Sequence, residues 1–122
     1  MAKLLIVDDE LDVREFAANF FRKRKIDVLT APSGEEALIL IDKDKPELVL
    51  LDIKMAGMDG METLKRIKEK DNSIKVIMVT GKKPDEENSF SKCKDLGALG
   101  YIHKPLKLEE LEKAVLQEIK PK

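Results

Sequence analysis

The chain has few of the residues that mark secreted, membrane or nucleic-acid-binding proteins. Its single cysteine, Cys93, excludes an intramolecular disulfide and fits a reducing compartment. Aromatic residues make up only 4% and tryptophan is absent, which argues against an aromatic surface for stacking bases. No apolar run approaches the roughly 20 residues of a membrane span. We therefore expect a cytoplasmic protein that does not bind membranes or contact nucleic acid directly.

Charge is abundant, but neither sign dominates. The 122 residues include 23 Lys or Arg and 24 Asp or Glu, which gives a formal net charge of −1. Charged residues make up 39%, well above the usual quarter, yet they form no polybasic arm. The length suits one compact domain. We predict a single domain over residues 1–122, without an output domain and working as a monomer.

Short apolar runs alternate with amphipathic segments along the chain. Three of the runs are almost continuously apolar, as strands buried on both faces of a sheet must be. Five strand–helix units with short connections predict an α/β fold, namely a doubly wound five-stranded parallel sheet with right-handed crossovers and helices on both faces. The predicted strands are residues 4–7, 26–31, 48–51, 74–79 and 99–103.

Helical periodicity fills the segments between these runs. The first helix has an apolar stripe at i, i+3, i+4 and i+7, which we expect to face the core: Val13, Phe16, Ala17 and Phe20. Ser33, followed three residues later by Glu36, predicts a capping box at the start of the second helix. The fourth helix, residues 85–96, has the weakest stripe and is predicted to end at Gly97 in a left-handed cap.

Polar and charged side chains stand at the ends of four predicted strands. The first strand ends in Asp8 and Asp9, and the third ends in Asp52. The fourth ends in Thr80, and the fifth runs into Lys104. Because the carboxyl ends of parallel strands meet at one edge of a sheet, these groups should share a small cleft.

A cluster of carboxylates at that edge needs a positive partner. Two carboxylates about 5 Å apart repel by roughly 3 kcal/mol at an effective dielectric near 20. A divalent cation removes that cost, and all-oxygen ligands favour Mg²⁺, which keeps several waters and accepts a phosphate as a further ligand. Lys104 adds a positive charge that can pair with a phosphate. The cleft therefore predicts phosphoryl transfer onto a carboxylate.

These motifs together resemble those of response-regulator receiver domains, over the whole length of the chain. The matching segments are residues 5–10, 50–55, 57–60, 79–81 and 97–105. The resemblance implies the flavodoxin-like strand order 2-1-3-4-5. It also implies a two-component phosphorelay protein that takes a phosphoryl group from the phosphohistidine of a sensor histidine kinase. The signal would leave by docking to an effector protein or by onward transfer to a histidine phosphotransfer protein.

The resemblance assigns a role to each residue of the site. Four residues form the implied Mg²⁺ site: Asp9, Asp52 and the backbone carbonyl of Lys54 would hold the ion, and Asp8 would assist through water. Asp52 would become the aspartyl phosphate. Thr80 would form a hydrogen bond to the phosphoryl group, Lys104 would pair with it, and Tyr101 would report the phosphorylated state. The chain would then be a phosphoacceptor and not a turnover enzyme.

The sequence departs from the family's pattern at several positions. Ala56 stands where a proline is usual, four residues after Asp52, and Lys107 occupies the cap region of the last helix. Lys54 lies two residues after Asp52, and Lys82 lies two residues after Thr80. The resemblance implies that these two positions flank the approach of water to the phosphoryl group. Because neither ammonium activates water, we expect slow self-dephosphorylation.

Two other readings stay open from the sequence. A Mg²⁺-dependent aspartyl-phosphate hydrolase would need a second acid two residues after its nucleophile, where this chain has Lys54. A degenerate receiver would act only as a binding module, and the intact set of acidic residues, Thr80 and Lys104 argues against it. Phosphorylation with acetyl phosphate and Mg²⁺ distinguishes the three.

Overall fold

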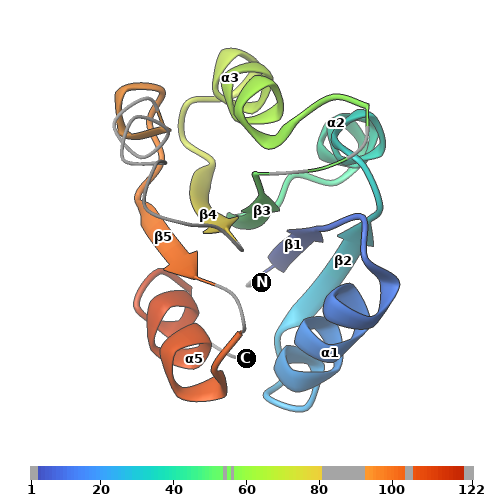
Figure 1. The fold of residues 1–122 in the computed structure, drawn as a ribbon, viewed down its shortest axis with the longest axis vertical. Coiled ribbons are helices and arrows are strands. Elements are labelled where there is room, and N and C mark those ends of the chain that lie inside the picture. The colour runs from blue at the N-terminus through green and yellow to red at the C-terminus, as the bar shows by residue number, and fades with distance from the viewer. Residues whose placement is uncertain (1–2, 54, 56, 81–92, 104–105, 120–122) are drawn as a thin grey trace.

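The structure is a computed structural model of the chain, and it describes residues 3–53, 55, 57–80, 93–103 and 106–119. Five strands alternate with helices along the chain (Figure 1). The strands are β1 (Lys3–Val7), β2 (Asp27–Ala31), β3 (Leu48–Asp52), β4 (Lys75–Thr80) and β5 (Gly100–His103). The helices are α1 (Leu11–Arg22), α2 (Gly34–Lys43), α3 (Gly60–Lys70) and α5 (Leu108–Leu116). Of the predicted fourth helix, residues 93–95 are helical and 85–92 lie outside the described residues.

The five strands form one parallel sheet in the order β2-β1-β3-β4-β5. This confirms the predicted α/β fold and its strand order. The order reverses direction at β1, which lies between β2 and β3, so the carboxyl ends of β1 and β3 border the crevice where such sheets bind ligands. Val7 pairs with Leu51 in the register, and the residues that follow each of them therefore emerge side by side.

Each face of the sheet is covered by its own helices, with α1 and α5 on one side and α2 and α3 on the other (Figure 1). Successive residues of a strand point to opposite faces, so Leu4 and Ile6 join the core with α1 and α5, while Leu5 and Val7 join the core with α2 and α3. Both faces of the sheet are therefore shielded from water by helices. This explains why β1 and β3 are almost continuously apolar.

Helix α1 does not bury the whole stripe expected from its sequence. Its buried residues are Ala17, Ala18 and Phe21, whereas Phe16 is 48% exposed. Phe20 is half-buried, packs against Phe21 edge-to-face and lies under the Arg24 guanidinium. The expectation that Phe16 faces the core is wrong, because the helix is rotated toward the neighbouring stripe.

Capping side chains fix the starts of α2 and α3. The Ser33 hydroxyl accepts a hydrogen bond from the Glu36 N–H at 3.2 Å, which confirms the predicted cap of α2. Asp59 caps α3 in the same way, by accepting from the Glu62 N–H at 2.8 Å. Gly97 has a φ of +104°, the left-handed conformation predicted for it.

Candidate functional site

Four acidic residues meet where β1 and β3 end. Asp8, Asp9, Glu10 and Asp52 each place one carboxylate oxygen within 4.8 Å of the others. Asp8 and Asp52 are both 3% exposed, whereas the other two are open to solvent. In the part of the chain that the structure describes, no other group of three or more His, Cys, Asp or Glu converges in this way. We call these four residues the acidic cluster.

Backbone and side-chain hydrogen bonds hold Asp8 in place. Its N–H donates to the Ala31 carbonyl at 3.2 Å, which continues the pairing of β1 with β2 by one residue. Its carboxylate Oδ1 accepts from the Glu10 N–H at 2.9 Å, and its carbonyl accepts from Arg14 Nη1 at 2.7 Å. These hydrogen bonds fix the position of Asp8, the first residue of the loop between β1 and α1. Its side chain is directed inward.

Close packing of backbone segments positions Asp52. The Ile53 N–H donates to the Val79 carbonyl at 3.0 Å, and the Ile53 carbonyl accepts from the Gly60 N–H at 2.8 Å. A Cβ atom on Gly60 would lie 2.1 Å from the Asp52 carbonyl oxygen, so this approach is possible only without a side chain. The first residue of α3 therefore packs directly on the end of β3.

Thr80 ends β4 at the same edge of the sheet. Asp52 pairs with Val79 in the register, so Thr80 lies one residue beyond the partner of Asp52 and is 1% exposed. His103 pairs with Thr80 and ends β5. Burial raises the pKa of the Tyr101 hydroxyl, two residues earlier on that strand.

The geometry brings together most of the residues singled out from the sequence. Asp8, Asp9 and Asp52 converge, and Thr80 lies at the same edge. Lys54 and Lys104 lie outside the described residues, so their roles stay predictions. Glu10 was missed, although its position directly after two strand-end aspartates was a signal that could have found it.

The acidic cluster fits a hard divalent cation. Its donors are all carboxylate oxygens, which Mg²⁺ prefers to nitrogen or sulfur. Two of these carboxylates are almost fully buried beside each other, an arrangement that is costly when both are charged and that a cation relieves. The donor set of the acidic cluster therefore suits Mg²⁺.

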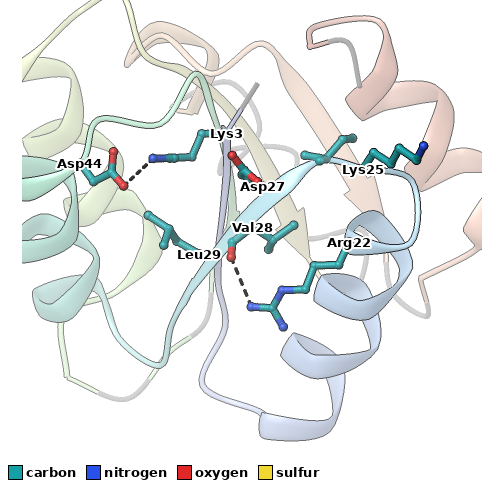
Figure 2. Close-up of a pocket in the computed structure, with 8 residues that line it drawn as sticks. Lys3, Arg22, Lys25, Asp27, Val28, Leu29 and Asp44 are labelled. Atoms are coloured by element: carbon teal, nitrogen blue, oxygen red, sulfur yellow. Dashed lines mark hydrogen bonds and ion pairs between the residues drawn. The ribbon is translucent and has the colours of Figure 1, made fainter. Parts of the chain in front are cut away.

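A hollow lies along β2, at the end of the strands opposite the acidic cluster (Figure 2). Two of its three cationic side chains, those of Lys3 and Arg22, are engaged within the protein. Lys3 forms an ion pair with Asp44 at 2.5 Å, and Arg22 donates to the Val28 carbonyl at 3.2 Å. The hollow is therefore a less suitable site for an anionic ligand than the edge that carries the acidic cluster.

The described part of the chain contains no helix that is both long and apolar enough to cross a membrane. Its fold and its site define a doubly wound α/β protein with a cluster of acidic residues at the topological switch point. Residues 4–116 match the response regulator receiver domain, and the chain belongs to that family.

Similar proteins support this assignment along nearly the full chain. Sporulation initiation phosphotransferase F of Bacillus subtilis (strain 168) is 41% identical over 113 residues, which cover 93% of this chain and 90% of that protein. Heme response regulator HssR of Staphylococcus aureus (strain MRSA252) is 35% identical over 113 residues, and the chain spans 48% of its length. The structure of the chemotaxis protein CheY4 of Vibrio cholerae superposes with a TM-score of 0.89 at 28% identity, covering 98% of this chain and 99% of that one.

The family defines what this class of protein does. Receiver domains are the phosphoacceptors of two-component phosphorelays, they bind Mg²⁺ at an acidic pocket, and they interact with sensor kinases and phosphotransfer partners. This chain has the fold of the family and a cluster of acidic residues at the expected edge.

Proposed function

We propose that Asp52 accepts the phosphoryl group, and that the donor is the phosphohistidine of a sensor kinase. The observation that carries the proposal is the position of Asp52, whose buried carboxylate lies at the switch point within 4.8 Å of the Asp8 and Asp9 oxygens. An aspartate there combines a nucleophilic oxygen with a neighbouring cation site. Phosphoryl transfer depends mainly on such positioning and charge neutralisation.

The transfer forms one bond and breaks one. A carboxylate oxygen of Asp52 bonds to phosphorus while the phosphorus–nitrogen bond to the donor imidazole breaks. The bonding electron pair stays on the imidazole nitrogen, which takes a proton from solvent. Mg²⁺, when bound, neutralises the charge that the incoming phosphoryl group brings beside the carboxylates.

Six residues serve this step in the proposal. Asp8, Asp9 and Asp52 hold the cation, and the Lys54 backbone carbonyl completes the protein ligands. The Thr80 hydroxyl donates to the phosphoryl oxygens, a role that its buried place at the end of β4 supports. The Lys104 ammonium pairs with the same oxygens. The roles of Lys54 and Lys104 rest on the family's pattern, since both lie outside the described residues.

Exposed apolar side chains flank the same edge. Leu11 begins α1 just after the acidic cluster and is 59% exposed, and Leu108 begins α5 and is 41% exposed. Both helices cover the same face of the sheet (Figure 1). We propose that the kinase, or a histidine phosphotransfer protein, packs against Leu11 and Leu108 while it presents its histidine to Asp52.

Acetyl phosphate with Mg²⁺, followed by intact mass and phosphate assay, tests the function. The receiver gains one phosphoryl group, and its mass returns slowly to the starting value. Sustained phosphate release in excess of protein would instead identify a hydrolase. A protein that gains no mass and releases no phosphate would be a binding module only.

The lifetime of the phosphoryl group is a separate prediction from the sequence. Lys54 and Lys82, neither of which lies among the described residues, carry no group that activates water, so the phosphoprotein should decay slowly. Decay of purified phosphoprotein is followed for the wild type, Lys54→Asn, Lys82→Glu and the double variant. The double variant should decay much faster than the wild type. Equal decay in all four would mean that the lysines do not protect the phosphoryl group.

A further inference from the structure

Strand β2 lies at one edge of the sheet, so part of its backbone faces away from the other strands. The Ala31 carbonyl accepts from the Asp8 N–H on the side of β1. Because backbone groups alternate in direction along a strand, the N–H and C=O groups of Val28 and Thr30 face outward. Outward groups of this kind can pair with a strand of another chain.

The composition of β2 favours such pairing. Residues 26–31 include the β-branched residues Ile26, Val28 and Thr30, carry one charge, that of Asp27, and contain neither proline nor glycine. Segments of this composition pair readily with copies of themselves when their edge is open. The occupant that fits this edge is therefore β2 of a second copy of the chain.

The Arg22 side chain lies on this edge. Arg22 is the last residue of α1, and its Nη2 donates to the outward carbonyl of Val28 at 3.2 Å (Figure 2). A partner strand would have to displace the guanidinium from this carbonyl and bury it at the new interface. Because arginine stays charged at neutral pH, burying it without a partner is costly. The hydrogen bond between Arg22 and Val28 therefore opposes the addition of a strand.

A tight turn holds Arg22 beside β2. The N–H groups of Lys25 and Ile26 donate to the carbonyls of Arg22 and Phe21, at 3.0 and 3.2 Å. Lys25 has a φ of +64°, the left-handed conformation that ends many helices. Because this turn is short, the last residue of α1 lies directly beside the edge strand that follows it.

We propose that Arg22 prevents self-association of the protein by blocking the β2 edge against β2 of a second copy. Loss of its hydrogen bond opens the outward groups of Val28 and Thr30 to the same groups of the second copy. This role is independent of the proposed phosphoryl transfer, because Arg22 lies at the end of the strands opposite the acidic cluster.

Size-exclusion chromatography with light scattering, over a range of protein concentrations, tests the inference. Arg22→Leu removes the donor and its charge, whereas Arg22→Lys keeps a charged donor at the same position. The matched control is Lys23→Leu, which removes a charge and adds an apolar side chain at the neighbouring exposed position, outside the hollow along β2.

We expect Arg22→Leu to associate at a concentration at least about tenfold below that needed by the wild type, Arg22→Lys or Lys23→Leu, since the cost of burying an unpaired charge is removed. If Arg22→Leu has the mass of the wild type at every concentration, the inference is overturned. It is also overturned if Lys23→Leu or Arg22→Lys associates as readily as Arg22→Leu does.

Amide hydrogen exchange separates pairing of β2 from aggregation through another surface. In associated Arg22→Leu, the amides of Val28 and Thr30 should exchange more slowly than in the wild type, while the amide of Leu29, which faces β1, should keep its rate. Adding Thr30→Pro to Arg22→Leu removes an outward N–H and should restore the monomer. If the double variant stays associated, or if the Val28 and Thr30 amides of associated Arg22→Leu exchange as in the wild type, the β2 edge is not the interface and the inference is wrong.

Discussion

The Asp52 side chain is placed by the fold in surroundings that oppose its own charge. It is 3% exposed and lies within 4.8 Å of three other carboxylates in the acidic cluster. Asp52→Asn keeps the shape and removes both the charge and the nucleophilic oxygen. We expect no phosphorylation by acetyl phosphate, as measured by intact mass, and a melting temperature in Mg²⁺-free buffer at least as high as that of the wild type. Undiminished labelling of the variant would show that another residue is the phosphoacceptor.

Arg14 is a second residue whose effect can be predicted from its contacts. Its guanidinium donates to the Asp8 carbonyl at 2.7 Å in a partly buried setting. Arg14→Met should lower the free energy of unfolding by about 1–2 kcal/mol, since a hydrogen bond from a charged donor to the Asp8 carbonyl is lost. Urea unfolding measures the loss.

The control for Arg14 is an arginine with an exposed ion pair. Arg66 pairs with Glu62 one turn away on α3, and the side-chain hydrogen bond between them raises the pKa of Arg66 and lowers that of Glu62. Because such a pair is screened by water, Arg66→Met should leave the urea midpoint almost unchanged. Equal losses of unfolding free energy in Arg14→Met and Arg66→Met would mean that the hydrogen bond to the Asp8 carbonyl stabilises the fold no more than an exposed ion pair does.

At the site, the sequence predicts the residues at the strand ends and misses Glu10, which follows the bend after β1. Asp8, Asp52 and Thr80 could be placed because parallel strands bring their carboxyl ends to one edge. The direction of the Glu10 side chain depends on the bend after β1, where the backbone closes onto Asp8 Oδ1. The position of Glu10 directly after Asp9 marks it as a candidate, but spacing along the sequence does not show that this bend brings its carboxylate to the acidic cluster.

At the scale of elements, α1 shows that periodicity alone does not determine which face of a helix is buried. Two stripes of equal spacing run along it: one through Val13, Phe16, Ala17 and Phe20, the other through Arg14, Ala17, Ala18 and Phe21. The structure buries Ala17, Ala18 and Phe21 and leaves Phe16 half exposed. The two alanines let the helix approach the sheet closely, a packing preference that a hydrophobicity count does not register. The strand pattern has no such ambiguity, since both faces of the sheet are buried.

The end of β3 and the first residue of α3 are packed so closely that a side chain at Gly60 should destabilise the fold. A Cβ atom on Gly60 would meet the Asp52 carbonyl oxygen at 2.1 Å and the Ile53 Cα at 2.6 Å, and both are backbone atoms that cannot rotate away. Gly60→Ala should therefore lower the free energy of unfolding by about 2–3 kcal/mol and weaken Mg²⁺ binding, because β3 must shift. Urea unfolding and MgCl₂ titration measure the two effects.

Gly100 is the matched glycine for this test. A Cβ atom added there, at the start of β5, meets nothing within 4 Å. Gly100→Ala should leave stability unchanged or raise it by up to about 1 kcal/mol, since alanine restricts the unfolded chain. If Gly60→Ala is tolerated as well as Gly100→Ala, the close approach of α3 to the end of β3 does not constrain the site.

Across the whole molecule, the acidic cluster is a local excess of charge in a nearly neutral protein. The chain has a formal net charge of −1, so a general attraction for cations is small, while four carboxylate oxygens lie within 4.8 Å of one another at one edge of the sheet. The unfolded chain has no comparable site, because Asp52 is brought to Asp8 only by the pairing of β1 with β3. Mg²⁺ should therefore stabilise the folded protein specifically.

The size of this stabilisation follows from mass action. At a Mg²⁺ concentration 100 times its dissociation constant, the gain in unfolding free energy is about 2.7 kcal/mol. For a domain of this length that gain raises the melting temperature by roughly 8–12 °C. Thermal unfolding followed by circular dichroism, in EDTA and in MgCl₂, measures the shift. NaCl at matched ionic strength should reproduce little of it, and Asp9→Asn should lose most of it. A shift that NaCl reproduces in full would identify general screening, and not a bound ion, as its cause.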